Sequence, residues 1–243
     1  MLLFNYDPMK RILTTLAAMT LVLAACTQEK VLKPTTLTPL PEIDLVKCEE
    51  LFFLLNKGPK TYDDLSQEDK ALIDLGLEDS VLEHFYSAAC SWYCGGEISD
   101  VSSSSALSDQ CNGEKAHDFS IMNAWVEGAP DNGKGEYLVY TFPGRCPRIT
   151  TIMILNGYTK TEKDWSDNGR VKRLRMYYNG RPYAILELED TRDLQSFDVG
   201  ILGYNDASAP DWTLKFEILD TYPGDKNSDT VITELYFDGI DVH

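Results

Sequence analysis

The spacing of hydrophobic positions changes once along the chain, near residue 94. Over residues 42–94, apolar side chains recur every three or four positions, which predicts a small α-helical segment. Gly58-Pro59 would end the first helix, Ser66 with Asp69 would start the second, and Asp79-Ser80 would precede the third. The predicted buried faces carry Leu45, Cys48, Phe52 and Leu55 in the first helix and Leu82, Phe85, Ala89 and Trp92 in the third.

Beyond residue 94, apolar residues alternate with polar ones, which is the pattern of half-buried β-strands. The predicted strands are Tyr137–Phe142, Ile149–Leu155, Val171–Tyr178, Tyr183–Leu188, Trp212–Leu219 and Val231–Phe237. Trp125 and Trp212 lie within or beside such runs and are expected in the core. Short strands separated by turn residues predict a mainly β fold over residues 95–243, a β-sandwich or jelly roll.

Asn179-Gly180 is the strongest turn signal, because a type I′ hairpin turn needs positive φ at both central residues. A two-residue turn here would place Lys172 opposite Glu187 and Arg170 opposite Glu189. The basic residues of this region could therefore pair with the acidic strand across the hairpin, or they could form a seat for an anionic sugar or headgroup. They are Arg170, Lys172, Arg173, Arg175 and Arg181.

Residues 1–25 have the composition of a cleavable export signal, with Met9 a better start than Met1. A basic Met9-Lys10-Arg11 precedes an uncharged apolar run that is shorter than the about 20 residues needed to span a bilayer. Leu23-Ala24-Ala25-Cys26 resembles the bacterial lipobox, in which the cysteine receives a diacylglyceryl group before cleavage. We therefore expect Cys26 to be lipidated; the alternative is a buried helix that happens to end in cysteine.

Residues 26–41 would then be the lipidated cysteine and a tether, because prolines at 34, 39 and 41 disfavour regular structure. Two or three acyl chains make a lasting membrane anchor. The expected product is an extracytoplasmic lipoprotein. Thr27 stands where inner-membrane retention is associated with Asp, so the outer membrane or cell surface is expected.

Charge argues against a nucleic-acid partner. Removing Lys10, Arg11 and Asp7 with the signal leaves 20 basic and 38 acidic side chains, a net charge of −18. Nucleic-acid binding depends on cationic contacts to phosphates, so a chain this acidic is a poor candidate.

Five cysteines remain after Cys26, and an exported chain meets an oxidising compartment in which disulfides are the default. The odd number leaves at least one thiol over, and the pairing cannot be read from the sequence. A zinc site formed by Cys90 and Cys94 with His84 or His117 would lack a second paired-ligand motif. The disulfide candidates are Cys48, Cys90, Cys94, Cys111 and Cys146.

No catalytic template fits, so the chain is not expected to be an enzyme. Residues 128–134 have P-loop spacing, but Gly135 replaces the required Ser or Thr and a strand follows where a helix is needed. The calcium-loop-like start at residues 225–229 lacks the glycine and the final glutamate. A hydrolase would need a buried carboxylate pair in a cleft.

Exposed aromatic side chains are the usual tools of sugar binding, and Trp165 lies in a polar, turn-rich loop between two predicted strands. Tyr158 could flank Trp165, while Asn168, Arg170 and Asp164 could bond sugar hydroxyls. The other interpretation is that Trp165 plugs one end of the sandwich.

Many short motifs in the β region together resemble a known family. They include residues 101–107, Ala116-His117-Asp118, residues 123–128, Asn156-Gly157-Tyr158, Trp165, Asn168 with Arg170, Tyr178-Asn179-Gly180, Tyr222 with Gly224 and Lys226, and residues 229–239. Their order over residues 98–240 is similar to that of discoidin-type, galactose-binding-like domains. It is closer still to the glycan-binding-type jelly roll of bacterial NAD glycohydrolase toxins and surface lipoproteins.

The resemblance implies a non-catalytic, carbohydrate-binding-like module. It also implies a possible structural calcium held by Asp118 and Glu234, although Ala124 stands where discoidin domains often place a threonine ligand. A disulfide from Cys111, with Cys146 as one candidate, could brace the same loop. No catalytic cofactor is implied.

Two functions follow from these features. The favoured hypothesis is a membrane-anchored module that binds a glycan through the loop around Trp165. The alternative is a lipoprotein that uses the same fold to bind a surface protein, without affinity for sugar.

Overall fold

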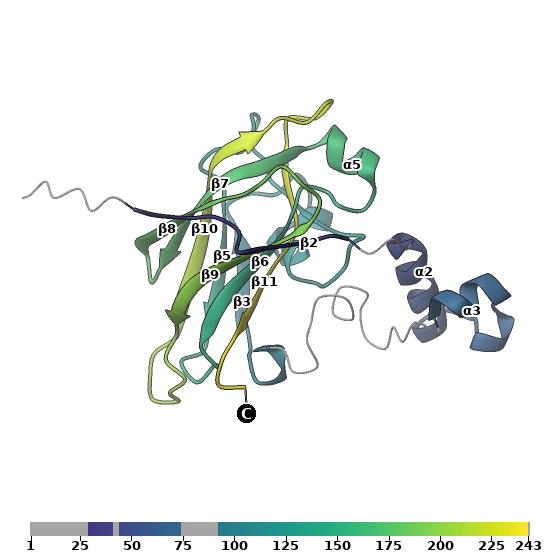
Figure 1. Cartoon of the computed structure of the whole chain (residues 1–243), viewed down its shortest axis with the longest axis horizontal. Coiled ribbons are helices and arrows are strands. Elements are labelled where there is room, and N and C mark those ends of the chain that lie inside the picture. The colour runs from purple at the N-terminus through teal and green to yellow at the C-terminus, as the bar shows by residue number, and fades with distance from the viewer. Residues whose placement is uncertain (1–28, 41–43, 74–91, 243) are drawn as a thin grey trace, which may run out of the picture.

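The computed structural model describes residues 29–40, 44–73 and 92–242, and its main body is a two-layered β-sandwich (Figure 1). The strands are β1 (Lys30–Leu32), β2 (Thr36–Thr38), β3 (Asp100–Ser103), β4 (Trp125–Val126), β5 (Tyr137–Phe142), β6 (Ile149–Asn156), β7 (Gly169–Tyr178), β8 (Arg181–Glu187), β9 (Leu194–Leu202), β10 (Trp212–Tyr222) and β11 (Thr230–Gly239). The helices are α2 (Leu45–Asn56), α3 (Gln67–Ile73) and α5 (Glu162–Asp167), with 3₁₀ turns at Tyr62–Asp64, Trp92–Cys94, Asp109–Cys111 and Gly113–Ala116. The predicted mainly β fold with a small helical part is confirmed.

The strands pair in the order β2-β9-β6-β11-β7-β10-β5-β3, with β8 and β1 added beside β7 and β4 beside β11. Most neighbours are antiparallel, but β11 and β7 pair in parallel through Thr230 with Gly169 and Val231 with Arg170. This short parallel pairing joins the two layers. Strands β5, β7, β9 and β11 therefore run in one direction, from the end that carries α5 to the end that carries the β7–β8 hairpin. We call these the α5 end and the hairpin end.

Alternating side chains of the two layers fill the core. Trp212, Leu214, Phe216 and Ile218 are buried, as their spacing in the sequence predicts. The rings of Trp212 and Phe142 stack with centroids 4.4 Å apart. The core placement expected for Trp125 and Trp212 is therefore confirmed.

The 3₁₀ turn Trp92–Cys94 also contributes to this core. The Trp92 ring is fully buried, meets Phe142 and Phe237 edge to face, and donates its indole N–H to the Pro147 carbonyl at 2.8 Å. The Tyr93 hydroxyl accepts the Phe237 amide at 3.0 Å. Residues at the end of the predicted helical segment thus pack inside the β-sandwich.

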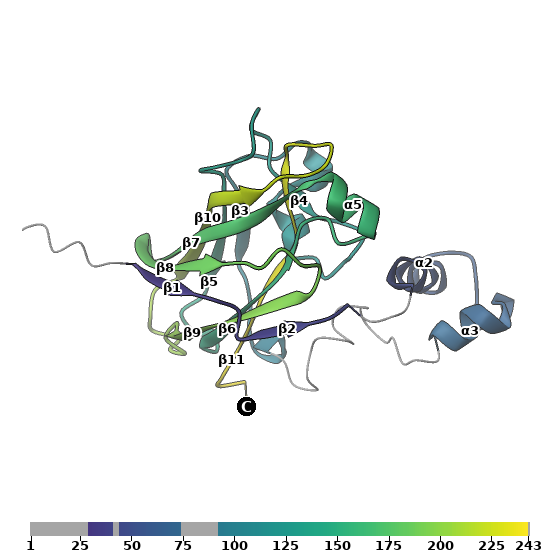
Figure 2. The same cartoon turned by 45° about the horizontal axis from the view of Figure 1, so that its top comes forward.

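Residues 29–40, which we call the N-terminal strap, lie against the sandwich. β1 pairs in parallel with β8, and β2 pairs antiparallel with β9, so the strap crosses from one layer to the other (Figure 2). The expectation of a tether without regular structure is wrong for these residues. Pro34 lies between the two short strands, where its missing N–H costs no hydrogen bond of the sheet. The strap covers the edges of β8 and β9, which would otherwise expose unpaired backbone groups.

The β7–β8 turn forms as predicted, with positive φ at Asn179 (49°) and Gly180 (71°). Moving away from the turn, Tyr177 pairs with Pro182, but the next pair is Met176 with Ala184, a shift of one residue in register. Arg173, rather than Lys172, therefore faces Glu187. Pro182 has no N–H to give to the ladder, which accounts for an irregularity at this point. The predicted pairing of Lys172 with Glu187 and of Arg170 with Glu189 is therefore wrong.

Strand β9 has no counterpart among the predicted strands, because its sequence does not alternate cleanly. Gln195 is polar yet fully buried. Its side-chain amide donates to the Glu189 carbonyl and accepts the Glu189 amide, both at 2.8 Å, so its polarity is satisfied inside the protein.

The first two predicted helices are confirmed. α2 ends before Gly58, and α3 begins with the Ser66 hydroxyl accepting the Asp69 amide at 3.1 Å. α2 buries Cys48 and Leu51, and Cys48 packs against Ile121 of the β domain. The third predicted helix, apart from Trp92, lies outside the described residues, as do the predicted signal peptide and Cys26.

Among the described residues, no helix is both long and apolar enough to cross a membrane.

The four described cysteines are unpaired, so the expected disulfides among them are not formed. The thiol of Cys111 is 3.2 Å from the Ser108 hydroxyl, whereas the buried Cys146 thiol donates to the Glu97 carbonyl. A Cys111–Cys146 bridge would need the two cysteines side by side, and they contact different segments instead. Cys90 lies outside the described residues.

Removing the strap should destabilise the domain. A chain beginning at Pro41 loses both β1 and β2, whereas a chain beginning at Glu29 keeps them. Each backbone hydrogen bond contributes about 1 kcal/mol, and each kcal/mol shifts the melting temperature of a domain of this size by about 2–4 °C, so we expect a loss of roughly 5–10 °C. Differential scanning calorimetry of the two chains checks this, and equal melting temperatures would contradict it.

Cysteine reactivity should follow burial. In reduced protein carrying Cys26→Ser and Cys90→Ser, a maleimide at about pH 8 should modify the exposed Cys94 first. Burial raises the thiol pKa of Cys48 and of Cys146, so both have little thiolate and should react only after denaturant is added. Peptide mass spectrometry over time gives the rate at each site. Equal rates at all sites would show that the buried placements are wrong.

Candidate functional site

The predicted ligand-binding residues gather at the α5 end, but the segment that carries Trp165 is a short helix rather than an open loop. Thr161 caps α5: its hydroxyl accepts the Asp164 amide at 3.0 Å and contacts the Asp164 carboxylate at 2.7 Å. Asn168 follows the helix and donates its side-chain amide to the Asp164 carbonyl at 2.8 Å. Asp164 and Asn168 therefore help to shape α5.

Trp165 is half-buried and held by Arg170. The Arg170 guanidinium lies 4.4 Å from the centre of the indole ring, and the indole N–H donates to the Asn156 carbonyl at 2.9 Å. Arg170 is itself buried and forms two hydrogen bonds with the Asp190 carboxylate, at 2.8 and 3.2 Å. One face of the indole is thus taken by a cation.

Gly157 permits this close packing. Its φ is +82°, and a Cβ on it would lie 2.7 Å from Arg170 Cγ and 2.8 Å from Trp165 Cδ1. Only glycine fits both the backbone angle and the space.

Tyr158 points elsewhere, donating its hydroxyl to the Met122 carbonyl at 2.9 Å. All five predicted residues (Trp165, Tyr158, Asn168, Arg170 and Asp164) thus contact other protein groups. Their ligand-binding role stays a prediction.

A cleft of about 450 Å³ opens beside α5, between the segment around Asn132 and the segment that follows β10. Its lining residues are Asn132, Lys134, Thr221, Tyr222, Pro223, Gly224, Lys226, Asn227 and Ser228. The Asn227 side chain donates to the Asn168 amide oxygen at 2.9 Å, which connects the cleft to α5. This cleft is therefore a polar site next to the predicted residues.

The buried carboxyl of Glu127 holds one wall of the cleft in place. It accepts the Thr230 amide at 3.1 Å and the Ala129 amide at 2.7 Å, and Thr230 in turn donates its hydroxyl to the Asn132 carbonyl. Burial raises the pKa of Glu127. The wall is therefore positioned by hydrogen bonds from the start of β11.

The charged residues that line the cleft are lysines, although the chain as a whole is acidic. Two lysines line it and no carboxylate does. Lys134 pairs with Asp220 at 3.0 Å and Lys226 pairs with Asp167 at 2.8 Å, but both lysine side chains stay about half exposed. The Tyr222 hydroxyl donates to the Leu188 carbonyl at 3.0 Å, which fixes its ring at the wall.

The basic residues of the β7–β8 region are mostly paired, which favours the structural interpretation of that stripe. Arg173 pairs with Glu187 at 3.8 Å, Arg175 with Glu29 at 2.9 Å and Lys172 with Asp220 at 3.8 Å.

Sequence reasoning did not assign the cleft residues to a site. Two signals pointed near them: residues 128–134 as a failed P-loop, and Tyr222 with Gly224 and Lys226 as part of the family resemblance. Neither signal shows that segments about ninety residues apart meet around one cleft.

A second cluster of acidic groups surrounds Ser120. The Ser120 amide donates to Asp118 at 3.2 Å and to Glu234 at 2.9 Å, while the Ser120 hydroxyl donates to Glu49 of α2 at 2.8 Å. Glu234 is fully buried, and its Oε2 has no hydrogen-bond partner among the described residues. The two residues expected to bind calcium, Asp118 and Glu234, therefore do lie together.

Their present contacts do not fit a calcium site. The Asp118 carboxylate accepts hydrogen bonds from the Lys115 ammonium at 3.0 Å and from the Asn123 side-chain amide at 2.8 Å. A calcium ion bound to this carboxylate would have to displace these donors. Within residues 29–40, 44–73 and 92–242, no three His, Cys, Asp or Glu side chains group as metal ligands. Lys115 supplies the positive charge that the calcium was expected to bring.

A family model for the NAD glycohydrolase translocation F5/8 type C domain matches residues 92–238, more than half of the chain. The chain belongs to this family. The match begins at Trp92, the first residue of the turn that packs into the sandwich core. The discoidin-like jelly roll expected from the sequence resemblance is thus confirmed for this F5/8 type C domain. No curated protein sequence matches the chain.

Solved structures similar to this F5/8 type C domain include modules from Clostridium perfringens. The CBM32-1 and CBM32-2 domains of ZmpB, in complex with GalNAc, are 15% identical with a TM-score of 0.44, covering 59% of this chain and 33% of that one. CBM32-3 from a family 31 glycoside hydrolase is 18% identical with a TM-score of 0.43, covering 64% and 100%. The chain thus spans about a third of the ZmpB fragment.

Glu234→Gln should remove a pH-dependent loss of stability. Burial and the nearby Asp118 carboxylate raise the pKa of Glu234 well above its ordinary value of 4.5. A carboxyl whose pKa is higher in the folded chain stabilises the fold below the unfolded value, and this stability is lost as the pH rises through the folded value. Relative to the variant, the wild-type free energy of unfolding should therefore fall as the pH rises above 4.5.

Urea unfolding of both proteins at a series of pH values measures this difference. Asp241→Asn is the control of opposite sign, since hydrogen bonding to Arg148 lowers the pKa of Asp241 below 3.8 and its stabilisation is lost as the pH falls. A wild-type-minus-Glu234→Gln difference that does not change with pH would contradict the prediction.

Proposed function

We propose that this protein is an extracytoplasmic lipoprotein, lipidated at Cys26, whose F5/8 type C domain binds a glycan without catalysis. The observation that carries the proposal is the polar cleft at the α5 end, whose charged lining residues are two lysines. Amide, hydroxyl and ammonium groups along its walls are the donors and acceptors that sugar hydroxyls need. The resemblance of residues 98–240 to glycan-binding-type jelly rolls, and the lipobox-like sequence before Cys26, support the rest of the proposal.

The charge of the cleft favours an acidic glycan, one that carries carboxylate or sulfate groups. The chain has a net charge of −17, but Lys134 and Lys226 line the cleft and no carboxylate does. An anionic ligand is therefore attracted to the cleft and repelled by the acidic groups elsewhere on the protein. Lys226 is 59% exposed and can leave Asp167 for a ligand at little cost, because exposed ion pairs stabilise weakly.

Lys226→Ala should weaken binding of an acidic glycan by about tenfold, the effect of losing about 1.4 kcal/mol of charge-assisted hydrogen bonding. Lys163→Ala is the matched control, because Lys163 binds the same Asp167 carboxylate but does not line the cleft. Trp165→Ala tests the α5 residues separately. A glycan array followed by affinity electrophoresis on acidic and neutral polysaccharides measures retention.

Two results would overturn the proposal. The first is that no glycan is retained at any ionic strength. The second is that Lys226→Ala and Lys163→Ala change affinity equally. Loss of binding in Trp165→Ala alone would move the site from the cleft to the exposed side of the indole.

A protein-binding role is the second candidate, and a separate groove of about 560 Å³ favours it. The groove lies between α2 and the 120–123 segment and is lined by Glu49, Glu50, Phe53, Leu54, Ser120, Met122 and Asn123. Phe53 is an exposed aromatic ring there. Stable capture of a surface protein that Phe53→Asp abolishes would establish this role.

A further inference from the structure

The position of the strap fixes where the chain enters the sandwich. Glu29 pairs with Arg175 of β7 at 2.9 Å, and Lys30 stands beside Ala184 of β8. Because β1 runs parallel to β8, which itself starts at the hairpin, the chain before Glu29 leaves toward the hairpin end. In Figure 1, β1 begins on the left beside β8, whereas α5 lies on the right.

The distance between Cys26 and the body is short. Two residues, Thr27 and Gln28, lie between Cys26 and Glu29. An extended chain spans at most about 3.3–3.6 Å per residue, so the Cα atoms of Cys26 and Glu29, three steps apart, are no more than about 11 Å from each other. A long tether would let the sandwich take any orientation to a membrane. A tether of two residues restricts the body to orientations in which the hairpin end is near the anchor.

The hairpin end carries exposed apolar side chains close to this point. Ile201, near the end of β9, is 60% exposed, and Tyr204, on the segment that follows β9, is 40% exposed. The Asn179 side chain donates to the Tyr204 hydroxyl at 3.0 Å, which ties this segment to the β7–β8 turn.

A second contact ties β9 to β8 next to the strap. The Tyr183 hydroxyl donates to the Val199 carbonyl at 2.7 Å. Tyr183 directly precedes Ala184, the residue that pairs with Lys30 of the strap. Exposed Lys30 and Arg181 add positive charge beside the apolar residues. Apolar side chains with flanking cations are the composition that a lipid–water interface accepts.

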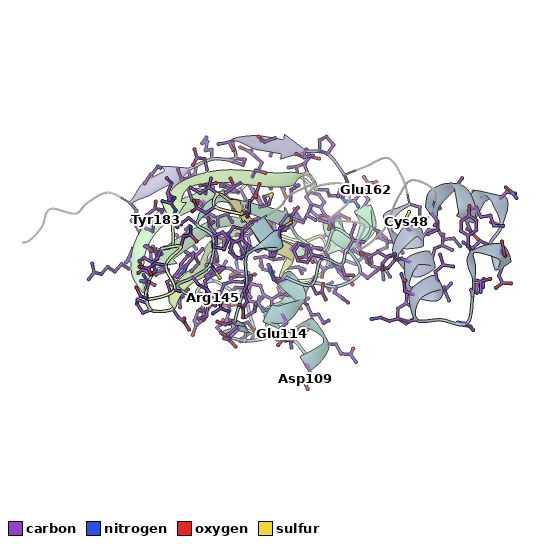
Figure 3. All side chains as sticks on the ribbon, turned by 90° about the horizontal axis from the view of Figure 1, so that it is seen from below. Cys48, Asp109, Glu114, Arg145, Glu162 and Tyr183 are labelled. Atoms are coloured by element: carbon purple, nitrogen blue, oxygen red, sulfur yellow. The ribbon has the colours of Figure 1, made fainter. Side chains whose placement is uncertain are left out.

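The cleft lies at the other end of the sandwich. β7 alone has 10 residues between the α5 end and the hairpin, a length of about 33 Å at about 3.3 Å per residue. In Figure 3, Tyr183 and Glu162, which begins α5, lie on opposite sides of the body.

We infer that the hairpin end, with Ile201, Tyr204 and Arg181, rests on the phospholipid surface and that the cleft faces away from it. This inference depends on the proposed lipidation of Cys26 but not on what the cleft binds. The orientation places the cleft roughly a strand length above the membrane, where it can meet a glycan that is not part of the same bilayer.

The test uses the full lipidated chain in phosphatidylcholine vesicles with rhodamine-labelled headgroups. An azidophenylalanine that carries a donor dye replaces Tyr204 in one protein and Lys226 in the other. Energy transfer to the headgroups should be about twofold or more greater from position 204, because the two sites differ in height by about one strand length. Equal transfer, or greater transfer from position 226, would overturn the inference.

Two substitutions test the contact itself. Ile201→Asp should lower transfer from position 204, since a carboxylate avoids the interface. Leu107→Asp is the matched control: Leu107 is 59% exposed, like Ile201, but lies at the α5 end, where the Leu107 amide bonds to the Val126 carbonyl. Equal effects of the two substitutions would overturn the contact.

Flotation and mass spectrometry separate this inference from the proposed function. A chain that carries no lipid on Cys26 and does not float with vesicles would overturn both. A chain that floats but shows the wrong transfer pattern overturns only the orientation, and a floating, correctly oriented chain that retains no glycan overturns only the glycan-binding role.

Discussion

The parallel pairing of β7 with β11 is the constraint on which the α5 end depends. Gly169 donates its amide to the Asp229 carbonyl at 3.0 Å, and a Cβ on Gly169 would lie 2.9 Å from that same carbonyl oxygen. This close approach joins the two layers. It also brings together the α5 segment before β7, the segment before β11 and, through the hydrogen bond from Thr230 to Glu127, the wall that carries Asn132. The cleft exists because three loops converge on this pairing.

The strap plays the corresponding role at the edges. By adding β1 to β8 and β2 to β9 it covers backbone groups that exposed edge strands would offer to other chains. The same pairing leaves only a short stretch between the sandwich and Cys26. The strap therefore both covers the edges of β8 and β9 and limits how an anchored sandwich would be oriented. A segment that is paired in register with a sheet cannot also act as a long, free tether.

Internal pairing decides which polar residues of this acidic chain are open to a ligand. Arg170, which the sequence suggests as a ligand-binding residue, forms an ion pair with Asp190 and packs over the indole of Trp165. Lys115 neutralises Asp118 where a metal was expected. Lys134 and Lys226 also pair with carboxylates, but their side chains stay 50% and 59% exposed.

The sequence by itself determined the features that depend on neighbours within a few residues. The buried face of β10, the Asn179-Gly180 turn and the end of α2 follow from spacing and turn chemistry, and many weak motifs together indicated the family. Tertiary structure decided what depends on distant partners. β9 is a strand although Gln195 interrupts its pattern, since Glu189 satisfies that amide. The strap forms strands because β8 and β9 offer free edges. The irregularity at Pro182 shifts the ion pairs across the hairpin by one residue. The cleft brings together Asn132 and Asn227, which are far apart in the sequence. Hydrogen bonds between segments far apart in the chain leave no periodic trace in the sequence, which is why only the folded structure shows them.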